Sequence, residues 1–412
     1  ILMKNVAVIG AGIVGLCTSF FLQKNGFKVT LIDQNIPGSG TSYGHACTFA
    51  DYACVPINSP SILKEVPSML LKNDGPLAID FIYLLKNLPW SYQFLKNCKK
   101  EKVEHIAQSL SKLLSHSRYY YDEIFNEIDV EAYINNNEAL YLYSSKKEYE
   151  YSKSTNDLRI KNNVKVKDLS KEEIKEIEPN IADVYYRGHL FEGTRYTTNP
   201  MKISSKIFDK FIEKGGSFIK NKVISIGKKE NSIELSLEGK KTNFDKIILS
   251  TGAWTKELAL KIGDKFPLDT EKGYHVLFSN TEKLISRPIG WSQSGFYIIQ
   301  IEEGIRSAGT VEIAGLNSKF NNKRVNMIEK QTRKLLPNLN EIKSTWVGYR
   351  PTLPDSLPVI DRSKSDERIF YAFGHQHIGW TTAAVTGKII QYLIDEKKPN
   401  FDISSFRASR FN

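Results

Sequence analysis

A glycine-rich turn near the N-terminus restricts the fold of this chain more than any other feature. Residues 10–15 read GAGIVG, which matches the spacing G-x-G-x-x-G. A short β-branched run precedes this turn, and a segment with helical apolar spacing follows it. In such a turn Gly10 allows the tight bend, Gly12 lets a pyrophosphate approach the backbone, and Gly15 lets the helix pack on the strand. The amides and the dipole at the helix N-terminus favour a bound phosphate.

A second predicted strand, residues 28–32, ends at Asp33, eighteen residues after Gly15. A carboxylate at the end of this strand can accept hydrogen bonds from ribose hydroxyls. The first 33 residues therefore predict a strand, a helix and a parallel strand that bind a dinucleotide with a free ribose. The turn by itself does not distinguish FAD from NAD.

The length of the chain predicts more than one domain, since 412 residues at roughly 150 per domain give two to three. The chain begins and ends with a strand, a glycine turn and a helix, and short strands dominate its middle. We therefore predict an α/β protein with a Rossmann-like nucleotide-binding domain built from separate segments and an inserted α+β substrate domain with a mostly antiparallel sheet. The predicted ranges are 1–75, 196–260 and 346–412 for the first domain and 76–195 and 261–345 for the second.

Composition excludes several classes of protein. Four cysteines without C-x-x-C spacing predict neither a zinc site nor a disulfide framework, and we expect no metal. No run of about 18 apolar residues predicts a membrane span, and no cleavable signal segment follows Met3, so we expect a cytoplasmic protein. The net charge of +11 permits an anionic partner, but the basic residues are scattered, and we expect no nucleic acid partner.

Three further segments carry a resemblance to a known family. Residues 250–254 read STGAW after an apolar strand, residues 348–360 read GYRPTLPDSLPVI, and residues 374–387 read GHQHIGWTTAAVTG. Together with the N-terminal turn they resemble the D-amino acid oxidase family of FAD flavoproteins, and most closely its D-amino acid dehydrogenase branch. The resemblance covers nearly the whole chain and is thin between residues 96 and 181. It implies an FAD-binding domain of the glutathione-reductase type.

The resemblance implies where FAD lies. In that family the glycine turn binds the pyrophosphate, the loop at residues 40–46 runs beside the flavin, and the N-terminus of the last helix points at the flavin ring, where its amides can stabilise negative charge. The implied contacts are Gly10, Gly12, Ile13, Val14, Gly15, Asp33, Gln34, Thr41, Ser42, His45, Val223, Thr251, Gly252, Trp254, Gly374, His375, Gly379, Trp380 and Thr381.

Three residues are implied to act on the substrate. Arg350 of the G-x-R-P motif grips the substrate carboxylate in family members, and a planar guanidinium suits this because it offers two parallel donors. The alternative is an arginine that pairs with an acid between the domains. His377 occupies a position that can contact small substrates, although a histidine in such a turn is often satisfied by the backbone. Tyr274 resembles a tyrosine beside the substrate pocket, or it is an ordinary core aromatic.

His45 departs from the family pattern, because D-amino acid dehydrogenases commonly have asparagine there. Related dimethylglycine and sarcosine dehydrogenases attach FAD covalently to a histidine in a similar loop. His45 is therefore either a covalent link to the flavin or a noncovalent flavin contact.

The implied activity is oxidative deamination of D-amino acids, with hydride passing from the substrate Cα to flavin N5 and the imine hydrolysing to a 2-oxo acid and ammonia. One alternative is oxidation of glycine, sarcosine, proline or hydroxyproline derivatives. A flavin-dependent tRNA-modification enzyme and a flavin-binding protein without catalysis are alternatives of other classes. The sequence leaves open the amino acid used, the choice between oxygen and a quinone as acceptor, and the oligomeric state.

The closest branch passes electrons to a quinone pool, which raises the question of membrane contact. Apolar residues with helical spacing at Leu77, Phe81, Leu84, Leu85 and Leu88 precede several lysines. Such a segment can lie in the interface of an anionic membrane, which predicts peripheral contact with the inner face of the cytoplasmic membrane. The alternative is an ordinary helix that packs on the substrate domain.

Overall fold

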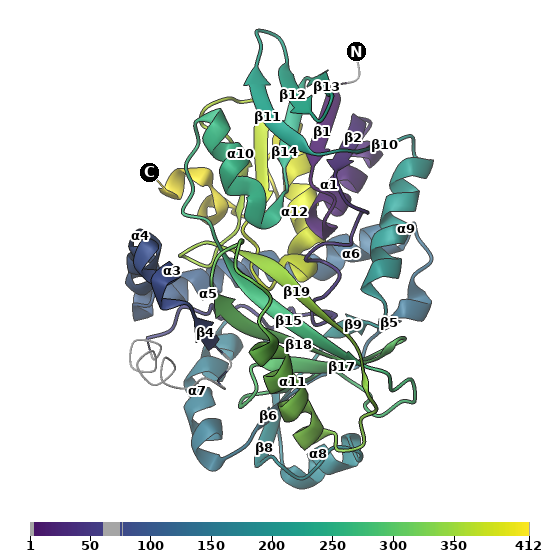
Figure 1. Ribbon diagram of the computed structural model, residues 1–412, viewed down its shortest axis with the longest axis vertical. Coiled ribbons are helices and arrows are strands. Elements are labelled where there is room, and N and C mark those ends of the chain that lie inside the picture. The colour runs from purple at the N-terminus through teal and green to yellow at the C-terminus, as the bar shows by residue number, and fades with distance from the viewer. Residues whose placement is uncertain (1–3, 61–74, 76, 412) are drawn as a thin grey trace.

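The computed structural model describes residues 4–60, 75 and 77–411. Its upper half in Figure 1 contains a six-stranded sheet. The strands in spatial order are β10 (Ser217–Lys220), β2 (Lys28–Asp33), β1 (Asn5–Ile9), β14 (Lys246–Leu249), β21 (Ile369–Phe373) and β20 (Val359–Arg362). All neighbours are parallel except β20, which is antiparallel to β21. The predicted N-terminal unit of strand, helix and parallel strand is confirmed.

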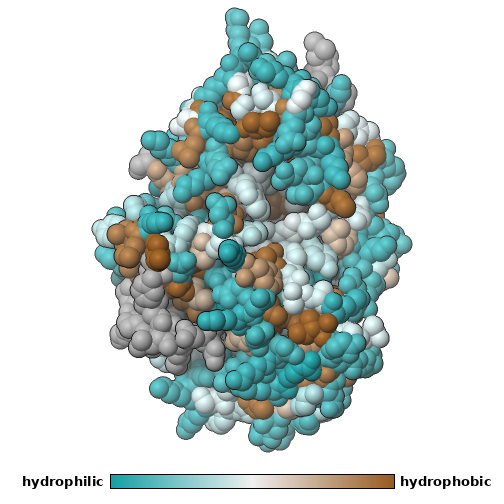
Figure 2. All heavy atoms as spheres, in the orientation of Figure 1, coloured by the Kyte–Doolittle hydropathy of each residue, from teal (hydrophilic) through white to brown (hydrophobic). Residues whose placement is uncertain are grey.

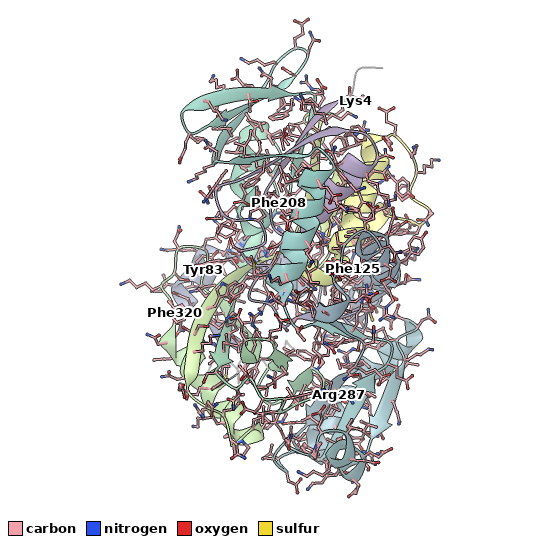
Figure 3. All side chains as sticks on the ribbon, turned by 90° about the vertical axis from the view of Figure 1, so that its right-hand side faces the viewer. Lys4, Tyr83, Phe125, Phe208, Arg287 and Phe320 are labelled. Atoms are coloured by element: carbon pink, nitrogen blue, oxygen red, sulfur yellow. The ribbon has the colours of Figure 1, made fainter. Side chains whose placement is uncertain are left out.

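Both faces of this sheet are covered, which explains its continuous apolar strands. On one face α1 (Ile13–Lys24) and α12 (Gly379–Ile394) pack on Val6 and Val8 of β1. The alternate residues Ala7 and Ile9 face a small antiparallel sheet. That sheet consists of β11 (Val223–Lys228), β12 (Ile233–Leu237) and β13 (Lys240–Phe244). In Figure 3, α9 (Pro200–Glu213), which carries Phe208, lies at the front of the molecule, and it packs on α1.

The lower half of Figure 1 contains a nine-stranded sheet that is mostly antiparallel. Its path runs through β19 (Ile342–Thr352), β15 (Asp269–Phe278), β18 (Gly304–Ile313), β17 (Phe296–Ile301), β16 (Ile289–Trp291), β6 (Ala139–Tyr143), β8 (Arg187–Phe191) and β7 (Val166–Leu169). The ninth strand, β4 (Leu77–Ile79), pairs in parallel with β18. One face of the sheet packs on α11 (Asn322–Leu335), and the other faces the loop that contains Cys47.

Further helices surround the two sheets. They are α5 (Lys100–Ser115), α6 (Ser117–Phe125), α7 (Lys146–Lys161), α8 (Lys171–Ile177) and α10 (Thr255–Ile262). A small sheet of β3 (Thr48–Phe49), β9 (Arg195–Thr197) and β5 (Ile134–Asn135) lies between the two large ones. Helices α5 and α6 come from the segment 76–195 but share the core of α1 and α12.

The predicted fold class is confirmed: the protein is α/β, with one mostly parallel sheet and one mostly antiparallel sheet. The division into two domains stays a prediction, and its boundary after residue 75 adjoins residues outside those described. The continuous helical pattern expected from Leu77 is wrong at its start. There, residues 311–313 of β18 extend beyond the part that pairs with β17 and pair instead with residues 77–79. The Asp80 carboxylate then accepts a hydrogen bond from Tyr83 N at the beginning of a helix.

That helix, α3 (Phe81–Lys86), is short, and α4 (Leu88–Lys96) follows it. A proline in the first turn of α4 separates the two, since its ring cannot continue the preceding helix. Within the described residues, no helix has the length and apolar character needed to cross a membrane.

Candidate cofactor and substrate site

A cavity of about 680 Å³ opens at the carboxyl ends of β1, β2, β14 and β21. Its volume falls within the roughly 300 to 1,000 Å³ of ordinary small-molecule sites, and this edge of an α/β sheet is where ligands bind. The predicted cofactor residues that line it are Gly10, Gly12, Ile13, Val14, Asp33, Gln34, Thr41, Ser42, Val223, Thr251, Gly252, Trp254, His375, Gly379 and Trp380.

The three glycines of the turn are required for different reasons. Gly10 has φ +101°, and a Cβ there would lie 2.5 Å from the Ser250 carbonyl oxygen. A Cβ at Gly15 would lie 1.8 Å from the Gly10 oxygen, so Gly15 serves the packing of α1 and does not line the cavity. At Gly12 the nearest atom to a Cβ is Ser42 Oγ at 3.4 Å. The protein itself has room for a side chain at Gly12, so the space that this glycine keeps open belongs to the cavity, as a bound pyrophosphate requires.

Asp33 is fixed at the end of β2 by backbone amides. Its Oδ2 accepts a hydrogen bond from Ala11 N at 2.7 Å, and its Oδ1 accepts one from Asn35 N at 2.8 Å. These bonds hold the carboxylate at the cavity wall beside the glycine turn. Each oxygen has a further lone pair, so the carboxylate can accept hydrogen bonds from ribose hydroxyls while it keeps the backbone bonds that hold it in place.

The loop after Gly40 is held between the two sheets. Thr41 Oγ1 donates a hydrogen bond to the Tyr349 carbonyl at 3.1 Å. Gly44 lies against the indole of Trp346, where a Cβ would come within 2.1 Å of the ring. The buried Arg306 of β18 donates a hydrogen bond to the Tyr43 carbonyl at 2.9 Å. The antiparallel sheet therefore positions the loop beside the cavity.

The two histidines before α12 differ in their surroundings. His375 Nε2 shares a 2.9 Å hydrogen bond with Thr386 Oγ1, and burial lowers the pKa of this histidine to about 3. His377 is exposed to the cavity, and partial desolvation by the surrounding protein, aided by the charge of Arg350, lowers its pKa to about 4. Both rings are neutral near pH 7 and can form hydrogen bonds without adding positive charge.

Two other predicted cofactor contacts near α12 interact with neighbouring parts of the protein instead. Gly374 has φ +85°, and a Cβ there would lie 2.5 Å from Leu353 Cδ1, so this glycine shapes the turn. Thr381 Oγ1 accepts a hydrogen bond from Ala50 N at 2.9 Å and so ties the loop to the helix. Neither residue lines the cavity.

His45 lies behind the cavity wall, stacked on Trp380 with ring centroids 4.2 Å apart. Its Nδ1 accepts a hydrogen bond from Cys47 N at 2.9 Å, and burial, followed by the charge of Arg306, holds its pKa well below the ordinary value. The neutral ring therefore carries its proton on Nε2. Among the described residues, this buried Nε2 has no hydrogen-bond partner. Because His45 does not line the cavity, a contact between this donor and a polar atom of the flavin stays a prediction.

A donor held in this way predicts a noncovalent contact. Acid denaturation followed by ultrafiltration is expected to release all flavin into the filtrate. Yellow colour retained with wild-type protein but released from a His45→Ala variant would establish the covalent link instead.

Arg350 lies on β19 between Tyr349 and Pro351, which line the cavity, whereas Arg350 itself does not. Its Nη1 donates a hydrogen bond to the Thr310 carbonyl at 2.7 Å. The guanidinium lies over Gly273, where a Cβ would come within 2.3 Å of Nη2. Burial lowers the pKa of this arginine, and the neighbouring Glu271 opposes that effect.

The structure does not bring Tyr274 to the cavity. This side chain is 1% exposed, its hydroxyl donates a hydrogen bond to Glu312, and it packs in the core that α11 covers. The alternate residues of β15 face the other way, since a strand sends successive side chains to opposite faces. Gly273 lies under the Arg350 guanidinium, and His275 Nδ1 shares a hydrogen bond with the Gly44 carbonyl.

Several cavity residues were missed by sequence reasoning. Around the β11 end the cavity wall includes Asn221, Lys222, Glu238, Glu257 and Lys261. No motif links these positions, which the fold brings together from separate elements. The buried acid Glu271 was also missed, because its neighbours Thr270 and Lys272 are polar and the local sequence gives no sign that this carboxylate is buried.

The chain is similar to several known proteins. The sequence profile described as FAD dependent oxidoreductase matches residues 5–393. A D-amino-acid oxidase of Bradyrhizobium diazoefficiens is 32% identical, with 99% of each chain covered. A D-amino acid dehydrogenase of Vibrio vulnificus is 24% identical, covering 95% of this chain and 96% of that one. The crystal structure of glycine oxidase from Geobacillus kaustophilus superposes with a TM-score of 0.77 at 18% identity over 99% of both chains.

Proposed function

Because the chain belongs to the family of FAD-dependent oxidoreductases, we propose that it is a dehydrogenase of D-amino acids. Both curated relatives are named for this substrate class, and one of them matches over almost its full length at 32% identity. When bound, FAD supplies the two-electron acceptor for oxidation of the Cα–N bond. The imine product then hydrolyses in water to a 2-oxo acid and ammonia.

The half-buried guanidinium of Arg350, beside the cavity-lining residues Tyr349 and Pro351, is the observation that carries this proposal. Its hydrogen bond to Thr310 uses one of five donors, and Gly273 leaves the surface beneath the guanidinium free of a side chain. A carboxylate can therefore be held by charge-assisted hydrogen bonds, which fixes one end of the substrate before the reaction.

His377 is proposed to contact the amine end of the substrate. The ring is exposed to the cavity, and partial desolvation by the surrounding protein together with the charge of Arg350 keeps it neutral near pH 7. A neutral imidazole can accept a hydrogen bond from an amine without repelling it, whereas a second cation would favour a dicarboxylate substrate.

Anaerobic mixing of the FAD-loaded enzyme with a panel of substrates tests the proposal. D-amino acids are expected to bleach the flavin absorbance, while L-enantiomers, glycine, sarcosine and proline should do so much more slowly. Fast bleaching by glycine or sarcosine together with inert D-amino acids would replace the proposed substrate class.

The electron acceptor is proposed to be a membrane quinone, and an exposed apolar surface supports this. Ile82, Leu85, Leu88 and Tyr92 are 68%, 64%, 56% and 69% exposed on α3 and α4, and we call them the α3–α4 patch. Figure 2 shows apolar atoms at the left edge, where Figure 1 places these helices. Clustered apolar side chains beside lysines suit the interface of an anionic membrane.

Flotation with vesicles of phosphatidylcholine and phosphatidylglycerol checks this surface. Wild-type protein is expected to float at low salt, and Leu85→Glu should lower the affinity for the vesicles about tenfold, since burying one leucine contributes about 1.5 kcal/mol or more. Ile212→Glu on α9, also at an exposed apolar position, is the matched control and should float like the wild type.

Two results would contradict membrane delivery of electrons. One is equal flotation of the Leu85→Glu and wild-type proteins. The other is a reduced flavin that reacts with oxygen as fast as with a quinone analogue, which would make the protein an oxidase, as the 32% identical relative is named.

A further inference from the structure

A buried acid lies beside the proposed carboxylate clamp. Glu271 on β15 is 3% exposed and stands directly opposite Arg350 on β19 in the antiparallel ladder. Directly opposed residues project from the same face of a sheet, with Cβ atoms about 4.5 to 5.5 Å apart. The two side chains are close enough for their charges to interact.

Arg350 is nevertheless not neutralised by a direct pairing with this acid. Its guanidinium extends diagonally over Gly273 and donates its hydrogen bond to the Thr310 carbonyl on β18. Glu271 therefore lies beside the arginine, where its charge changes the field at the guanidinium without occupying the guanidinium's donors. Since this region is shielded from water, one added charge there has a large effect on a bound anion.

We propose, on the premise that Arg350 binds the substrate carboxylate, that Glu271 is a positioning residue whose protonation state sets how strongly that clamp binds. With Glu271 neutral, the whole positive charge of Arg350 is available to an incoming carboxylate. With Glu271 ionised, the arginine is partly compensated, and the incoming carboxylate meets a like charge.

Because of the groups around it, Glu271 is expected to change its protonation state near neutral pH. Burial raises the pKa of Glu271 to about 7, although Arg350 acts in the opposite direction. Arg350 keeps its charge, and His377 is already neutral above its pKa of about 4. Asp269, two residues earlier on β15, adds negative charge near Glu271 and is itself faced by Lys256 on α10. The affinity for a carboxylate should therefore fall as the pH rises through about 7.

Benzoate is a suitable probe because it carries a carboxylate that stays ionised from pH 6 to pH 9 and has no amine. Its dissociation constant is measured with the FAD-loaded enzyme from the change in flavin absorbance. Wild-type protein should show a constant value below pH 6 and a rise of about tenfold or more by pH 9, since the coupled loss of one proton changes affinity by at most tenfold per pH unit. Glu271→Gln should bind benzoate within about twofold of the wild-type value at pH 6, with no dependence on pH.

Asp269→Asn is the matched control, because it removes a neighbouring carboxyl from the same strand and should keep the slope. A slope that persists in Glu271→Gln, or that disappears in Asp269→Asn instead, overturns the proposal, and so does a flat wild-type profile. If Glu271→Gln does not fold, Glu271→Met supplies a neutral side chain of similar size and should give the same flat profile. Turnover should follow the same pattern, with the change in KM and not in kcat.

Failure of this inference is distinguishable from failure of the proposed clamp. Arg350→Leu should lose benzoate binding at every pH. If it binds benzoate as the wild type does, the clamp itself is wrong. If it loses benzoate while Glu271→Gln keeps the slope, only the role of Glu271 is wrong.

Discussion

An Arg350→Leu variant that still binds FAD is expected to lose about 30- to 1,000-fold in kcat/KM for D-amino acids, mainly through a higher KM. Leucine keeps the apolar stem but removes the donors that would face the carboxylate. One charge-assisted contact in a shielded pocket contributes about 2 to 4 kcal/mol. A contact made equally in the ground state and the transition state appears in KM, because it does not change the height of the chemical step.

Steady-state kinetics and flavin content, measured on the same preparations, check this result. Arg187→Leu is the control, since Arg187 is a surface arginine that pairs with Asp168 on the far side of the second sheet. Kinetics close to wild type in a fully flavin-loaded Arg350→Leu protein would show that this arginine has a structural role only.

The parts of the fold that sequence reasoning identified are those governed by local signals. The strand, glycine turn and helix at each end follow from apolar periodicity and from glycines at fixed offsets, and both units are present. The predicted cofactor residues near the first turn likewise line one cavity, because a strand that ends at a glycine turn places its neighbours at one edge of the sheet.

The position of Tyr274 could not be predicted from local sequence signals. Strand β15 is buried on both faces along nearly its whole length, so its sequence has no polar and apolar alternation that assigns each residue to a face. Only the pairing with β18 and β19 shows that Tyr274 faces α11, while Glu271 and Gly273 lie on the same face of the sheet as Arg350.

The short strand β4 illustrates the same limit. Its pairing with Val311–Ile313 joins segments more than two hundred residues apart, and three apolar residues read equally well as the start of a helix. Non-local pairings of this kind depend on which sheet edge the rest of the chain leaves open, which no local pattern reveals.

A Gly12→Val variant is expected to fold but to lose FAD. The backbone at Gly12 has φ −68° and ψ 175°, which valine adopts readily, and a Cβ there meets only Ser42 Oγ at 3.4 Å. The added methyl groups instead enter the cavity at the place proposed for the pyrophosphate. A side chain in that space removes the phosphate site altogether, so affinity should fall by about 1,000-fold or more, equivalent to about 4 kcal/mol.

FAD binding and folding are measured separately. Flavin absorbance per protein reports FAD binding, and circular dichroism of the flavin-free proteins reports folding. Gly227→Val in β11 is the matched control, because a Cβ there also finds room, with its nearest neighbours at 3.8 Å, but Gly227 does not line the cavity. Full flavin occupancy in a folded Gly12→Val protein would mean that the phosphates lie elsewhere. Loss of flavin in both variants would assign the effect to general destabilisation, whereas loss in Gly12→Val alone assigns it to the cradle between β1 and α1.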